Sequence, residues 1–139
     1  MTDTRRGHCT LPHTADLIVE AWGDRFSTCA EEAATGLLEI CVGARPSEQS
    51  SVVKIESGRP TDLLAAILDE VVYTLDTSDL VPVGVELTEM PGGAVELRFG
   101  LAAREAVQST GAVPKAIVML ESPDEARPGP ARCRFLVDV

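Results

Sequence analysis

The first candidate for chemistry is Asp16, an aspartate that stands directly before an apolar run. Residues 17–22 combine branched apolar side chains with the chain's only tryptophan and stop at Gly23, which predicts a strand. A carboxylate at the start of a strand can leave the sheet and face a site. It is there either a turn former that bonds its own backbone, or a metal ligand or acid–base group. The local sequence leaves both interpretations open.

A second candidate lies in the alternating segment over residues 131–138. Apolar side chains occupy every second position from 133 to 137, which predicts a strand that stays paired in a sheet to its last residues. The Asp138 carboxylate and the main-chain oxygens of Val139 would then be held on fixed backbone. Adjacent negative charges are unfavourable unless a cation or an arginine neutralises them, and Arg134, on the same face of that strand, is the arginine expected to do so.

Two amphipathic helices are expected to help position these carboxylates. Apolar residues at helical spacing predict a helix that begins at Ser27 or Thr28 and ends at Gly43. Thr28 and Glu31 fit a capping box, in which each side chain satisfies a backbone N–H of the first turn. Glu31 and Glu32 would lie near the positive end of the helix dipole, which explains them without catalysis.

A stronger apolar stripe predicts a second helix, from about Thr61 to the polar run 76–79. Alternating segments predict strands over residues 8–11, 17–22, 51–56, 81–90, 94–101, 113–121 and 131–138. Pro12 interrupts the first of these, which requires a turn or an edge position. Residues 81–90 and 94–101 form a hairpin around Pro91-Gly92-Gly93. The sequence therefore predicts one α+β domain over residues 1–139, with two helices packed on a mostly antiparallel sheet.

The acidic composition narrows the classes of partner. The chain has 139 residues, 45% of them hydrophobic, and a formal net charge of −10. Such a surface repels phosphate backbones, so direct nucleic-acid binding is not expected. It suits cations or a basic partner protein, or serves solubility alone. No apolar run approaches the length of a membrane span, and no apolar segment of a signal peptide follows Arg5 and Arg6.

The cysteines give an expectation about the compartment. Their scatter forms no C-x-x-C pair and suits no zinc knuckle. We expect buried free thiols in a reducing cytoplasm at all four positions: Cys9, Cys29, Cys41 and Cys133.

The run His13-Thr14-Ala15-Asp16, followed by an apolar strand and Trp22-Gly23, resembles the archease family. Further segments of the same family pattern follow in order: Ala30–Leu37, Asp62–Asp76, Lys115-Ala116 and the closing Leu136-Val137-Asp138-Val139. The resemblance covers nearly the whole chain. The sequence departs from the family pattern where acidic, threonine, aromatic and histidine residues are usual: Pro12, Val118, Met119 and Leu120.

The resemblance implies an archease-like fold and a protein cofactor that is not itself an enzyme. Archeases assist the RtcB-type tRNA ligase by promoting its guanylylation and turnover, and they bind a divalent cation, typically calcium. Carried over, the metal ligands are Asp16, Asp138 and a main-chain oxygen of Val139, with magnesium or manganese as alternatives to calcium. Calcium takes about 6–8 oxygen ligands, so water or the partner would have to complete the shell. His13 either orients Asp16 or is a structural histidine.

Two other functions stay open. The chain could be a chaperone-like modulator of an RNA-modifying enzyme, such as a tRNA methyltransferase, that acts by surface contact without metal. Calcium dependence separates this alternative from the ligase cofactor. A small enzyme that uses Asp16 and Asp138 as acid and base ranks last, because no nucleophile–base arrangement accompanies them.

Overall fold

The computed structural model describes residues 5–13, 16–42, 46–56, 60–77, 79–106, 114–123 and 129–138. At residues 12–13, 60–62 and 106 it describes the backbone alone. Its secondary structure consists of seven strands, two α-helices and two short 3-10 turns over these residues.

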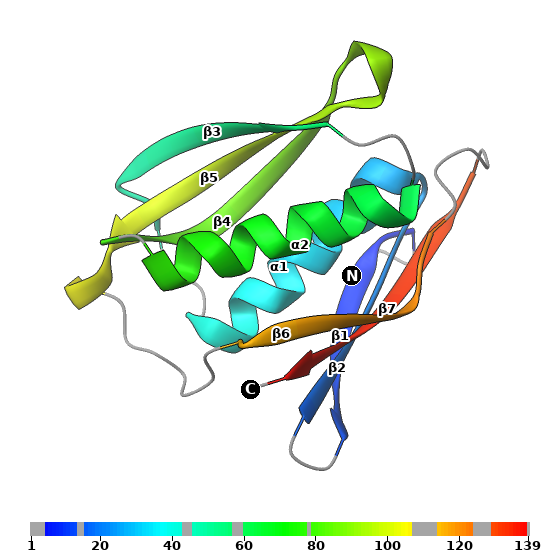
Figure 1. Ribbon diagram of the computed structural model, residues 1–139, viewed down its shortest axis with the longest axis horizontal. Helices are drawn as coiled ribbons and strands as arrows, with labels where there is room; N and C mark the ends of the chain where they lie inside the picture. Colours follow the sequence, from blue (N-terminus) through cyan, green and yellow to red (C-terminus); the bar gives the residue numbers. More distant parts are fainter. Residues whose placement is uncertain are drawn as a thin grey trace.

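Two antiparallel sheets enclose the two helices (Figure 1). The first sheet has the order β1-β2-β7-β6, formed by Gly7–His13, Asp16–Gly23, Ala131–Asp138 and Ala116–Glu121. The second has the order β3-β5-β4, formed by Gln49–Ile55, Val95–Ala103 and Leu80–Glu89. Helices α1 (Phe26–Cys41) and α2 (Pro60–Thr77) lie between the sheets in Figure 1. The α+β prediction is confirmed, and the antiparallel strands form two separate sheets.

Both sheets and both helices contribute to one hydrophobic core. The apolar stripes of the helices and the inward-facing positions of the strands meet there, as their periods of 3.6 and 2 require. Phe99 of β5 and Phe135 of β7 are fully buried, together with Leu37 of α1 and Leu64 of α2. The two sheets are therefore held together through the helices.

The first helix does not start as the sequence predicted. It begins at Phe26, and the residue before it, Arg25, makes no side-chain capping bond. The Thr28 hydroxyl donates instead to Asp24 Oδ1 at 2.6 Å, so the Thr28–Glu31 capping box is wrong. Glu31 is also outside the first turn, which contains no acidic residue. Burial of Phe26 against the core moves the start of the helix to that residue.

Several strand predictions hold with small shifts. The hairpin is confirmed, and its turn is closed by Met90 N–H donating to the Ala94 carbonyl at 2.8 Å. Gly92 and Gly93 adopt φ of 85° and 86° in that turn, a region that favours glycine. Strand β1 continues through Pro12 to His13, which proline tolerates because β1 is an edge strand.

The cysteines are free, as expected. Cys29, Cys41 and Cys133 are buried, whereas Cys9 is partly exposed, which corrects the expectation for that residue. Burial raises the pKa of the Cys41 thiol to about 11. Within the described ranges, no helix has the length and hydropathy required to cross a membrane.

Candidate functional site

The structure brings the two predicted aspartates together. Asp16 is the first residue of β2 and Asp138 is the last of β7. These strands pair antiparallel, with Leu17 opposite Val137. Continued by one residue toward the end of the sheet, the same register sets Asp16 opposite Asp138. Residues 122 positions apart in sequence therefore meet at one end of the first sheet.

Neighbouring strands continue this row. His13 of β1 pairs with Asp16, and Ala116 of β6 pairs with Asp138. The backbone N–H of Lys115 donates to the Asp138 carbonyl at 2.7 Å, which fixes the end of β7. Asp16 is half-buried and Asp138 is exposed. The His13 side chain and all of Val139 lie outside the described residues, so their predicted roles stay predictions.

The chemistry of this pair fits a hard cation. Side chains directly opposite on antiparallel strands have Cβ atoms about 4.5–5.5 Å apart, and like charges there are unfavourable. Carboxylate oxygens are the ligands that calcium and magnesium prefer. Over the described parts of the chain, no group of three or more His, Cys, Asp or Glu side chains forms a metal cage. A cation held by Asp16 and Asp138 would need further oxygen ligands from elsewhere.

Arg134 does not neutralise Asp138. It lies opposite Glu20 in the β2–β7 register, and its Nε is 3.5 Å from Glu20 Oε1. The described residues provide no ion-pair partner for Asp16 or for Asp138. The alternative that an arginine on the same strand compensates the carboxylate is therefore wrong for this structure.

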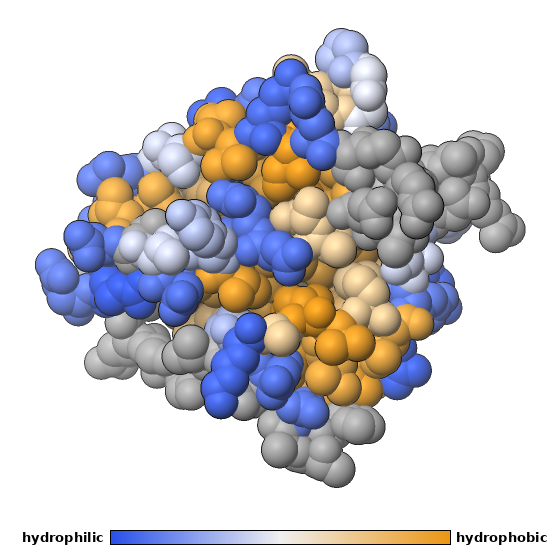
Figure 2. Space-filling model, in the orientation of Figure 1, coloured by the Kyte–Doolittle hydropathy of each residue, from blue (hydrophilic) through white to orange (hydrophobic). Residues whose placement is uncertain are grey.

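An apolar row lies beside the aspartates on the same face of the sheet. The register aligns four side chains across β1, β2, β7 and β6: Leu11, Ile18, Leu136 and Val118. Val118 is 51% exposed and the neighbouring Leu120 is 50% exposed. Figure 2 shows orange, hydrophobic surface over β6. Two of the departures from the family pattern, at Val118 and Leu120, thus add exposed apolar surface next to Asp138.

An ionic cluster that no pattern in the sequence predicted joins β1 to α1. His8 Nδ1 lies 2.6 Å from Glu32 Oε1, and His8 Nε2 lies 2.8 Å from Glu39 Oε2. Arg6 donates to Glu32 at 2.6 Å and to Glu31 at 3.1 Å. Burial disfavours the charged ring, but the hydrogen bonds to Glu32 and Glu39 outweigh it, and the pKa of His8 is raised. Only the tertiary structure reveals this role, since the partners are more than 20 residues apart.

Glu31 also contacts the second sheet. Its Oε2 accepts a hydrogen bond of 3.1 Å from the backbone N–H of Leu87 in β4. The two glutamates that the sequence assigned to the helix dipole, Glu31 and Glu32, are thus links between α1 and the strands. Among the described residues, the contacts of these two glutamates are structural.

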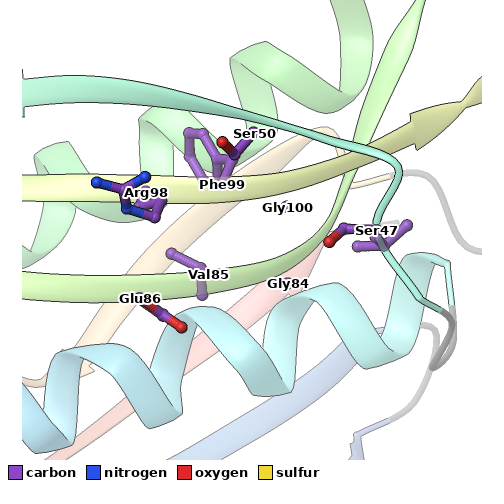
Figure 3. Close-up of a pocket in the computed structure, with 9 residues that line it drawn as sticks. Ser47, Ser50, Gly84, Val85, Glu86, Arg98, Phe99 and Gly100 are labelled. Carbon is purple, nitrogen blue, oxygen red and sulfur yellow. The ribbon is translucent and has the colours of Figure 1, made fainter.

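A hollow of about 330 Å³ lies on the outer face of the second sheet (Figure 3). The register sets Ser50, Gly100 and Gly84 side by side there, so two of three neighbouring positions carry no side chain. A Cβ on Gly100 would lie 2.8 Å from Ser47 Cβ, which explains that glycine by packing. The hollow is on the opposite sheet from the aspartates and does not contribute to their site.

Comparison with known proteins identifies relatives over nearly the full chain. Residues 8–139 match the model of the Archease protein family (MTH1598/TM1083). Proteins named "Probable protein archease" from two strains of Mycobacterium tuberculosis are each 34% identical over 139 residues. Those alignments cover 98% of this chain and 76% of each relative.

Solved structures share the fold. The solution structure of Methanobacterium thermoautotrophicum protein 1598 aligns with a TM-score of 0.71 at 20% identity, covering 96% of this chain and 99% of that one. A crystal structure from Thermotoga maritima, described as an archease and possible chaperone, aligns with a TM-score of 0.65 at 17% identity. That alignment covers 93% of this chain and 94% of the other. At such low sequence identity, the structural similarity establishes a shared fold and nothing more.

Proposed function

Because the chain belongs to the archease family, we propose that it is a protein cofactor that promotes guanylylation and turnover of an RtcB-type tRNA ligase. It binds a divalent cation, calcium in the first instance, and has no catalytic activity of its own. It acts in the cytoplasm, where free thiols such as its four cysteines stay reduced.

The observation that carries the proposal is the register of β2 and β7, which pairs Leu17 with Val137 and, continued by one residue, sets Asp16 opposite Asp138. Because neither carboxylate has an arginine partner among the described residues, uncompensated negative charge lies at this end of the first sheet. A bound cation removes their repulsion and supplies positive charge at the surface where the ligase docks. Asp16 and Asp138 hold it, and the Val139 main-chain oxygen is the third donor that the chain can offer.

Strand pairing holds the two aspartates in position for binding a cation. Both carboxylates project from paired backbone, so little rotational freedom is lost when they act together. The Lys115 N–H holds the Asp138 carbonyl and so limits fraying at the end of β7. The remaining coordination positions belong to water or to oxygen atoms of the ligase.

A calorimetric titration tests the cation site. Asp16→Asn and Asp138→Asn keep the size of each side chain and remove its charge. We expect each to weaken calcium affinity about tenfold or more, because a charged oxygen ligand is lost. Asp69→Asn, an exposed aspartate of α2, is the matched control and should bind calcium as the parent does. Unchanged affinity in both site variants would refute the site.

A ligation assay tests the function. The ligase of the same organism is assayed with and without this protein, over calcium and magnesium concentrations. We expect faster guanylylation and more turnovers with the protein present, and loss of this gain in Asp16→Asn. If the protein stimulates equally in the presence of a chelator, the metal-dependent proposal is wrong.

The apolar row favours a second candidate, a chaperone-like modulator of an RNA-modifying enzyme such as a tRNA methyltransferase. Exposed Val118 and Leu120 offer a surface for contact without metal. This function predicts that Val118→Ser reduces the effect on the partner enzyme while Asp16→Asn leaves it intact. The opposite pattern would support the ligase cofactor.

A further inference from the structure

A second hollow, of about 610 Å³, lies on the first sheet at the end opposite to the aspartates. The last residues of β2 and the first of β7 form it, with Arg5 and Cys9 at its side. Trp22 is six residues along β2 from Asp16 and points to the same face, at about 20 Å for a rise of about 3.3 Å per residue. The hollow is therefore separate from the proposed cation site.

The indole of Trp22 forms a wall of this hollow. It lies across Gly7 of β1, its register partner, where an added Cβ would approach Cζ2 of the ring to 2.6 Å. The missing side chain at Gly7 thus lets the ring pack closely on β1, while the Trp22 side chain stays partly exposed. A held, accessible indole is a stacking surface for a planar aromatic ligand.

The charged side chains around the indole differ in whether they already have a partner. Glu20 is occupied, since it lies 3.5 Å from Arg134 Nε and accepts a weak hydrogen bond from Cys9. Asp24 accepts the Thr28 hydroxyl at 2.6 Å. Arg132 lies directly opposite Trp22 in the register, is exposed, and has no hydrogen-bond or ion-pair partner among the described residues. The hollow therefore presents an available guanidinium next to an aromatic ring.

We propose that this hollow binds a free nucleoside monophosphate, with its base stacked on Trp22 and its phosphate bound by Arg132. An aromatic face and a guanidinium are the two groups that recognise a base and a phosphate. The volume falls within the roughly 300–1,000 Å³ of small-molecule sites. A net charge of −10 disfavours a longer RNA, whose many phosphates the rest of the surface would repel.

The single tryptophan makes binding directly measurable, because all indole fluorescence of the protein comes from Trp22. The full chain is titrated with AMP, GMP and UMP, and separately with guanosine, inorganic phosphate and a short RNA. We expect saturable quenching by the nucleotides, and at least about tenfold weaker binding of guanosine and of phosphate, because each offers one of the two recognised groups. Calorimetry repeats the titrations, so that binding without quenching is also detected.

Arg132→Gln should weaken nucleotide binding about tenfold, because the phosphate loses its cationic partner. Arg98→Gln, an exposed arginine on the other sheet, is the matched control and should leave it unchanged. Asp16→Asn should also leave it unchanged, which separates this site from the cation site. The proposal is overturned if millimolar nucleotides produce neither quenching nor heat, if phosphate alone binds as well as a nucleotide, or if the RNA binds more tightly.

Discussion

His8 shows how a single side chain can link two elements of this fold. Its ring lies between two carboxylates of α1, and its side chain is only 19% exposed. Hydrogen bonds of a charged ring to carboxylates are stronger than those of a neutral ring. The protonated form of His8 therefore holds the edge strand β1 on the helix more firmly than the neutral form does.

This contact predicts a pH-dependent contribution to stability. The pKa of His8 is raised in the folded protein above its ordinary value of 6.5. The stabilisation is thus complete below about pH 6.5 and is lost as the pH rises through the folded pKa. We expect His8→Gln to lower the free energy of unfolding by about 1–2 kcal/mol at pH 6, and by less at pH 8.5, in urea denaturation.

Arg6→Gln is the control for this prediction. Arg6 binds the same glutamate but stays protonated over the whole pH range, so its loss should cost similar stability at both pH values. A His8→Gln effect that grows between pH 6 and pH 8.5 would contradict the assigned role of the ring.

At the scale of elements, the close approach of β2 to α1 depends on Gly23. An added Cβ at this position would lie 2.6 Å from the backbone nitrogen of Cys29 and 2.7 Å from Thr28 Cβ. Backbone in the first turns of a helix cannot move aside without shifting the helix itself. Gly23 therefore sets the distance between α1 and the strand that carries Asp16.

We expect Gly23→Ala to lower the free energy of unfolding by about 2–3 kcal/mol, because the methyl group overpacks against backbone. Gly84→Ala is the matched control in β4, since its added Cβ meets no atom within 4 Å. That variant should be neutral, or more stable by up to about 1 kcal/mol. Chemical denaturation of the two variants measures the difference, and equal losses would contradict the packing argument.

For the molecule as a whole, the net charge of −10 is a source of self-repulsion in the compact state. Salt screens such repulsion over a Debye length of about 10 Å at 0.1 M. We expect the thermal midpoint to rise by a few degrees when NaCl is raised from about 0.02 M to about 0.3 M. Scanning calorimetry or circular dichroism measures this shift.

A variant with less net charge tests the cause. Asp69→Lys and Glu89→Lys alter two exposed side chains, and since each changes the charge by two, the net charge goes from −10 to −6. The salt-induced rise should be smaller in this variant. A rise of the same size in both proteins would show that self-repulsion is not its source.

Local patterns in the sequence determined much of this protein. Period-2 alternation predicted β7 over residues 131–138, and apolar stripes predicted both helices to within a few residues. These features depend on neighbours within a few positions, so a single sequence contains them. Asp16 and Asp138 stood out for the same reason, each as a charge at the end of an apolar strand, and the family resemblance joined them into one site.

The tertiary structure alone decided which segments became neighbours. Strand pairing placed the predicted strands in two sheets. One register set Arg134 opposite Glu20 and Trp22 opposite Arg132, and its continuation by one residue beyond Leu17 and Val137 sets Asp16 opposite Asp138. The tertiary structure also turned Glu31 from its predicted capping role toward β4, and paired Glu32, which was assigned to the helix dipole, with His8 of β1. Register and layer packing are fixed by contacts between residues far apart in the chain, where burial of the shared core outweighs local preference. No periodicity in the sequence expresses such contacts.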